Sequence, residues 1–188
     1  MIVSNRLCEL AHELSALLSR HGCRIAFAES CTAGWLSALL STIPGISQSL
    51  CGSAVVYREL TKHSWLDVSA HDLNDPAIGA VSPEVATQMA MGVLEHTPEA
   101  DLSAAITGHL GPNAPAHQDG VAFIAVARRT PHECQVVQVR QVQLGTDCPD
   151  GISLRWHRQQ FAVALVYEAV IQTIPSQFDT SSDDRPTS

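Results

Sequence analysis

Residues 24–34 read RIAFAESCTAG and join a short apolar run to a polar turn that ends in glycine. The apolar run at 24–28 fits a buried strand, and the leucines after Gly34 recur at helical spacing. Ser30 therefore stands at a strand-to-helix turn, the place where open α/β sheets bind ligands. Free backbone N–H groups and the helix dipole favour an anion there, either a phosphate or the oxyanion of an acyl-transfer intermediate. The alternative is that Ser30 only caps the helix.

Helical and strand patterns alternate around this stretch, which indicates a three-layer α/β/α sandwich with a mixed, mostly parallel sheet. Three consecutive strands near the end require at least one antiparallel pair. We expect one domain over residues 1–174 and a disordered polar tail over 175–188. Predicted helices lie at about 4–20, 35–40, 62–66, from 82 onward and at 153–173. Predicted strands lie at 24–28, 50–57, 102–106, 121–127 and 136–144, with a β-bulge expected at 140–141. Loops are expected at 72–79 and 107–119.

Composition excludes several classes of protein. Of 188 residues, 45% are hydrophobic, which is enough to bury a core. Eleven Lys and Arg against nineteen Asp and Glu give a net charge of −8 without a basic cluster, so a nucleic-acid surface is not expected. No apolar run reaches membrane-span length and no secretion signal opens the chain, which predicts a cytoplasmic protein without membrane contacts. The six cysteines lack metal-binding spacing, so we expect reduced thiols, mostly in the core, and no metal site.

Two further stretches carry groups that suit catalysis or ligand binding. Tyr57 ends a predicted strand, and Lys62 follows five residues later. A lysine lowers the pKa of a nearby phenol, whose phenolate then accepts a serine proton; the alternative is a packed ring and a solvated lysine. The loop TGHLGPN at 107–113 offers a hydroxyl and glycines that let the backbone approach a ligand. A plain connecting loop is its alternative.

Together these stretches resemble the CinA C-terminal domain family, which includes nicotinamide-nucleotide amidohydrolases. The likeness covers about residues 5–170 and rests on five motifs in the family's order. They are AESCTAG at 28–34, PGIS at 44–47, Y-x-x-x-x-K at 57–62, GAVS at 79–82 and TGxxGP at 107–112.

The resemblance implies a CinA-like fold and hydrolysis of the carboxamide of nicotinamide mononucleotide to nicotinate mononucleotide and ammonia, a step of pyridine-nucleotide salvage. Ser30 is the implied nucleophile and Tyr57 its base, while Lys62 tunes the tyrosine or stabilises negative charge. No metal or organic cofactor is implied, and a homodimer or larger homo-oligomer is expected. The implied substrate-binding residues are Glu29, Cys31, Thr32, Thr107, Gly108, Gly111 and Arg158.

This sequence also departs from the family pattern. Ala33 replaces a second glycine, and the loop after Thr107 is bulkier at His109, Leu110, Asn113 and Ala114. Two family arginines near the last helix align with Ser153 and His157 rather than with Arg155 or Arg158, so a small local shift is needed to bring one of these two arginines to a phosphate. Because the chain is acidic, an anionic substrate requires local cations, which we expect from Lys62, Arg58, Arg158 and the helix terminus.

These departures keep two alternative functions open. One is a catalytically inactive paralogue that serves as a nucleotide-binding or interaction module. The other keeps the amidase chemistry on a different amide. A thiol mechanism through Cys31 is disfavoured, because one step along a helix rotates a side chain by about 100° away from Ser30.

Overall fold

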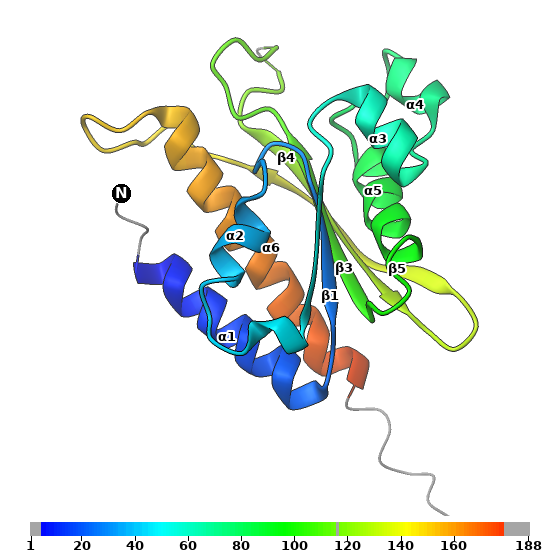
Figure 1. The fold of residues 1–188 in the computed structure, drawn as a ribbon. Helices are drawn as coiled ribbons and strands as arrows, with labels where there is room; N and C mark the ends of the chain where they lie inside the picture. Colours follow the sequence, from blue (N-terminus) through cyan, green and yellow to red (C-terminus); the bar gives the residue numbers. More distant parts are fainter. Residues whose placement is uncertain (1–4, 116, 179–188) are drawn as a thin grey trace, which may run out of the picture.

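The computed structural model describes residues 5–115 and 117–178, which build a five-stranded sheet in the order β2-β1-β3-β4-β5 (Figure 1). β1 pairs in parallel with β2 and β3, whereas β4 runs antiparallel to both β3 and β5. The mixed α/β sheet expected from the sequence is confirmed. The strands are β1 (Ile25–Glu29), β2 (Leu50–Val55), β3 (Leu102–Gly108), β4 (Val121–Arg129) and β5 (Cys134–Gln143).

Helices cover both faces of the sheet and complete the three layers (Figure 1). One face carries α1 (Asn5–His21), α2 (Trp35–Leu40) and α6 (Leu154–Phe178). The opposite face carries α3 (Glu59–Leu66), α4 (Ala70–Asn74) and α5 (Pro83–Glu95), and a short 3₁₀ helix spans Ile46–Gln48. As the sequence indicates, Ser82 caps α5 by accepting a hydrogen bond from the Val85 N–H.

Alternation along the central strand β1 divides its side chains between two cores. Ile25 and Phe27 pack into the cluster beneath α1 and α6, whereas Ala26 and Ala28 belong to the cluster beneath α5. Successive side chains of a strand point to opposite faces. Glu29 therefore points toward the α2 side and the next residue, Ser30, toward the α3 and α5 side. This alternation positions the candidate site.

The structure corrects several predicted boundaries. α3 begins at Glu59 rather than at 62, and the expected loop at 72–79 overlaps α4, a helix too short to show periodicity in sequence. Its first turn is capped by the Ser69 hydroxyl, which accepts a hydrogen bond from the Asp72 N–H. The bulge expected at 140–141 is instead a register shift at Val126/Ala127 of β4, opposite β5.

At the end of the chain, α6 continues to Phe178, so residues 175–178 are helical rather than part of a tail; 179–188 lie outside the described residues. The cysteines are free thiols: Cys23 and Cys31 are buried in the core, Cys51 and Cys134 pack against it partly buried, and Cys8 is exposed. The described residues contain no cluster of three or more metal-ligating side chains. Within the same residues, no helix is long and apolar enough to cross a membrane.

Candidate active site

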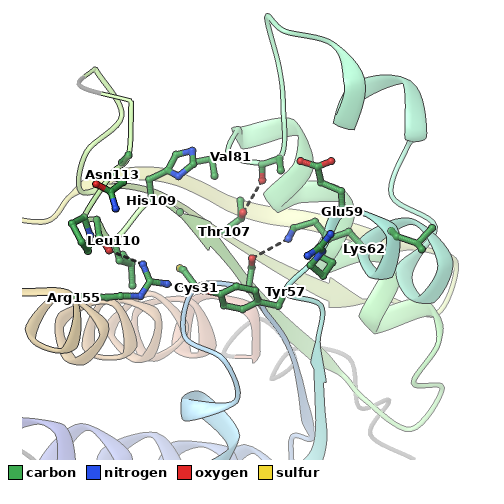
Figure 2. A pocket seen from close by; sticks show the side chains of 18 residues that line it. Cys31, Tyr57, Glu59, Lys62, Val81, Thr107, His109, Leu110, Asn113 and Arg155 are labelled. Carbon is green, nitrogen blue, oxygen red and sulfur yellow. Dashed lines mark hydrogen bonds between the residues drawn. The ribbon is translucent and has the colours of Figure 1, made fainter.

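A cavity of about 520 Å³ opens at the carboxyl ends of β1 and β3, at the sheet edge indicated by the sequence (Figure 2). Its volume falls in the range of small-molecule sites, roughly 300–1,000 Å³. Four segments and one helix end supply the lining. They are Ser30 and Cys31 after β1, residues 57–60 and 62 from the link after β2 and the first turn of α3, Ala80 and Val81 before α5, residues 107–114 from the end of β3 and the loop after it, and Arg155 in the first turn of α6.

Strand register brings Ser30 and Thr107 together on one face of the sheet. Glu29 pairs with Ile106, and the Ser30 N–H donates to the Ile106 carbonyl at 3.1 Å. Ser30 and Thr107 are thus the next residues on two neighbouring parallel strands. Since paired side chains point the same way and alternate along a strand, both face the α3 and α5 side, and both line the cavity.

Lys62 forms the central contact of the site. Its ammonium donates to Ser30 Oγ at 2.9 Å (Figure 2). It also donates to the Val56 carbonyl at 2.8 Å. Lys62 is only 2% exposed, and this burial lowers the pKa of its ammonium from 10.5 to about 8. Because a carbonyl can only accept, one N–H of Lys62 stays with Val56, and a neutral amine can direct its lone pair at the serine hydroxyl. An amine in this position can act as a base toward a serine hydroxyl, which is one way in which nucleophilic serines are activated.

Tyr57 lines the same cavity as Ser30, but its hydroxyl bonds to Arg155 rather than to the serine. Its side chain is 52% exposed, and its hydroxyl accepts a hydrogen bond from Arg155 Nη2 at 2.7 Å. Arg155 Nη1 donates to the Gly111 carbonyl at 2.8 Å, so the guanidinium bridges α6, the loop after β3 and the segment after β2. In the described part of the chain, no hydrogen bond joins Tyr57 to Ser30. The expected relay from Ser30 through Tyr57 to Lys62 is therefore replaced by direct contact between serine and lysine.

Glu29 and Thr32, both expected to bind substrate, instead build the turn. The Glu29 carboxylate is 0% exposed and accepts a hydrogen bond from Thr32 Oγ1 at 2.8 Å. Neither residue lines the cavity. The carboxylate occupies the amino terminus of α2, which corrects the expectation that this terminus binds a ligand anion. Its other donors are the N–H groups of Gly34, Leu36 and Ser37 and the hydroxyls of Ser37 and Ser53.

Arg158, the arginine expected to meet the substrate, lies outside the cavity lining. It is 1% exposed and binds Asp119 through two hydrogen bonds of 2.8 Å each, while its Nε donates to the Gly145 carbonyl at 3.0 Å. Of the two arginines of α6, the one that lines the cavity is Arg155, whose described contacts are all to neutral oxygens. Sequence reasoning missed it because the alignment put the family's arginines at other positions; its place in the first turn of the last helix was the available signal.

The remaining expected residues line the cavity. At Gly111, φ is +65° and an added Cβ would lie 2.8 Å from Asp119 Oδ1, while at Gly108 it would lie 2.5 Å from the Ala122 Cβ. Both positions thus require glycine for backbone and packing reasons. Burial raises the pKa of the Cys31 thiol to about 12, so this thiol is protonated at neutral pH.

Comparison with known proteins agrees with the fold and identifies the family. The family model described as the CinA C-terminal domain matches residues 7–151. CinA-like proteins of Synechococcus elongatus and Gloeobacter violaceus are each 39% identical over 131 residues, which cover 70% of this chain and 30% of each relative. The chain thus spans about a third of the length of these relatives. A crystal structure of a competence/damage inducible protein from Agrobacterium tumefaciens superposes with a TM-score of 0.79 at 27% identity, over 92% of this chain and 98% of that one. The chain belongs to the CinA C-terminal domain family.

Proposed function

We propose that this protein hydrolyses the carboxamide of nicotinamide mononucleotide to nicotinate mononucleotide and ammonia. The observation that carries the proposal is the hydrogen bond of 2.9 Å between Lys62 and Ser30 at the wall of a ligand-sized cavity. In this proposal Ser30 is the nucleophile and Lys62, in place of Tyr57, is the general base.

In the first half-reaction, Ser30 Oγ attacks the carboxamide carbon and its proton passes to the neutral amine of Lys62. The C–N bond then breaks, and the Lys62 ammonium returns the proton to the departing nitrogen, which leaves as ammonia. A pKa of about 8 suits both roles, because efficient general acid–base groups have pKa values near the working pH. The product of this half-reaction is an ester between Ser30 and the nicotinoyl group.

In the second half-reaction, water attacks the ester carbonyl and gives its proton to Lys62. The bond between Ser30 Oγ and the carbonyl carbon breaks, and Lys62 returns the proton to Ser30. The carboxylic acid that forms loses its proton to solvent and leaves as the carboxylate of nicotinate mononucleotide. The Val56 carbonyl holds the amine in place throughout, because its hydrogen bond to Lys62 does not depend on the serine proton.

Arg155 supports an anionic substrate. Its guanidinium lines the cavity and, among the described contacts, donates only to a carbonyl and a phenol. A phosphate would offer this guanidinium a charge-assisted bidentate partner, which is stronger than either neutral oxygen. Arg58 also lines the cavity, so local positive charge opposes the net charge of −8.

The test is ammonia release by purified protein supplied with nicotinamide mononucleotide. Ser30→Ala and Lys62→Met are expected to abolish turnover, whereas the exposed Ser41→Ala, at the end of α2, serves as the matched serine control. Turnover that survives Ser30→Ala would remove the serine from the mechanism. Binding without turnover in the unaltered protein would instead favour the inactive, nucleotide-binding paralogue.

Two variants separate the candidate bases and nucleophiles. Tyr57→Phe removes the hydroxyl that Arg155 holds and is expected to retain turnover, because Lys62 already contacts Ser30. Cys31→Ala is expected to retain the chemical step as well. Loss of activity in Cys31→Ala together with full activity in Ser30→Ala would establish the thiol mechanism instead.

A further inference from the structure

We propose that Thr107 makes the cavity select an uncharged primary carboxamide over the corresponding carboxylate. This inference rests on the proposed function, because it assigns the selected group to the carbon that Ser30 attacks. It concerns which ligand the site holds, and it is therefore measurable by binding as well as by turnover.

The hydrogen bond of Thr107 fixes the polarity of its hydroxyl. Thr107 Oγ1 lies 2.7 Å from the Ala80 carbonyl oxygen, and the residue is only 1% exposed (Figure 2). A carbonyl oxygen cannot donate, so the single proton of the hydroxyl must point at Ala80. Only lone pairs remain for a ligand, and Thr107 is an obligate acceptor in the cavity.

The position of Thr107 directs this acceptor toward the reacting group. Thr107 and Ser30 follow the paired residues Ile106 and Glu29 on adjacent parallel strands, and both face the same side of the sheet. When Ser30 Oγ attacks a carbonyl carbon, the nitrogen or second oxygen on that carbon therefore lies near the ends of β1 and β3, where Thr107 is. An NH₂ group there can donate to Thr107 Oγ1. A carboxylate oxygen in the same place has no proton to donate, so its lone pairs and those of Thr107 Oγ1 repel each other.

Selection against a carboxylate has to overcome the positive charge of the cavity lining. Three cationic side chains, Lys62, Arg58 and Arg155, line it against one carboxylate, Glu59, so the lining as a whole attracts anions. A carboxylate product would therefore bind well unless another group disfavoured it. Specificity against a near-isosteric competitor commonly depends on such a repulsive element. Thr107 supplies one, and it also orients the leaving nitrogen, which needs a proton from Lys62.

The test compares binding of nicotinamide mononucleotide and nicotinate mononucleotide by calorimetry, in a Ser30→Ala background that prevents turnover. Thr107→Val preserves the shape but removes the acceptor, and Thr107→Ser retains it. We expect the preference for the carboxamide to fall by about 5- to 150-fold in Thr107→Val, the loss expected when a buried donor has no acceptor. Thr107→Ser is expected to keep the preference.

The same preference in Thr107→Val as in the parent would overturn the inference, and so would failure of the parent to bind either nucleotide. If the melting curve shows that Thr107→Val does not fold, Thr107→Ala replaces it with the same readout. Ammonia release by the unaltered protein is measured separately. If the protein releases no ammonia but its binding preference depends on Thr107, the proposed hydrolysis is rejected and the role of Thr107 in selection stands. If it releases ammonia but the preference does not depend on Thr107, the role of Thr107 is rejected and the hydrolysis stands.

Discussion

Lys62→Met tests the protonation state of the Lys62 amine, on which the proposed chemistry depends. Lys62 is the only lysine of the 188 residues, and burial lowers the pKa of its ammonium from 10.5 to about 8. At pH 7 the amine is protonated in both the folded and the unfolded chain. The difference, 10.5 − 8 = 2.5, then corresponds to about 3 kcal/mol of destabilisation from the buried charge, at about 1.4 kcal/mol for each pKa unit.

The sign of the pH dependence follows from proton binding. Between pH 8 and 10.5 the unfolded chain binds more protons at Lys62 than the folded chain does, so the free energy of unfolding rises with pH. From pH 7 to pH 9, the contribution of Lys62 to that free energy increases by about 1 kcal/mol. From about pH 8 upward the raised pKa values of Cys23 and Cys31 act in the opposite direction, because in the unfolded chain these thiols ionise around the ordinary value of 9.0.

Urea denaturation of the unaltered protein and of Lys62→Met at pH 7, 8 and 9 measures this effect. We expect the free energy of unfolding of the unaltered protein to rise by about 1 kcal/mol relative to that of Lys62→Met over the range. ¹⁵N labelling of lysine gives a single side-chain signal, whose titration reports the pKa directly. A titration near 10.5, or a stability difference that does not change with pH, would refute the assignment of Lys62 as a base near neutral pH.

Three further substitutions test the frame around the site, each by urea denaturation. Ala33→Gly is expected to raise the free energy of unfolding by about 1 kcal/mol, because Ala33 has a φ of 55°; Ala38→Gly, inside α2, is expected to lower it by about 1 kcal/mol, and equal effects would contradict the argument. Glu29→Gln is expected to lower it by about 2 kcal/mol, because an amide cannot accept all the buried donors that the carboxylate accepts, whereas the exposed Glu13→Gln should change it by less than about 0.5 kcal/mol. Gly92→Ala is expected to lower it by about 1–3 kcal/mol, because its Cβ would lie 2.1 Å from a carbonyl oxygen at the end of α3; an unchanged value would show that α3 moves freely.

The sequence predicted the sheet and its layers because hydrophobic periodicity is a local signal. The same signal held more information about the site. Residues 24–28 were predicted as a strand, and continuing its alternation by two residues sends Glu29 and Ser30 to opposite faces. Assigning both to the substrate was therefore inconsistent with the strand itself. The alternation favoured Ser30 for the cavity and left Glu29 to hold the turn beneath α2.

What the sequence did not predict are contacts between segments far apart in the chain. Tyr57 and Lys62 are five residues apart, which suggests that they act on each other, but Tyr57 bonds to Arg155, 98 residues away. Arg155 and Arg158 are equally plausible cations by spacing. Only the position of Asp119, whose carboxylate binds Arg158, shows which guanidinium is committed to the fold.

The same reasoning explains why a single buried amine can carry the proposed chemistry. A lysine at the surface would titrate near 10.5 and would be a poor base at neutral pH. Lys62 lies in the first turn of α3, and its amine is buried, with the Val56 carbonyl just after β2 and the Ser30 hydroxyl as partners. Moving the amine toward solvent would remove the cost of the buried charge and so stabilise the protein. It would also return the pKa of the amine to its ordinary value, so that the amine would no longer be a useful base at neutral pH. Stability and catalysis thus make opposite demands on Lys62. We therefore expect a substitution such as Lys62→Met to stabilise the protein and abolish turnover at the same time.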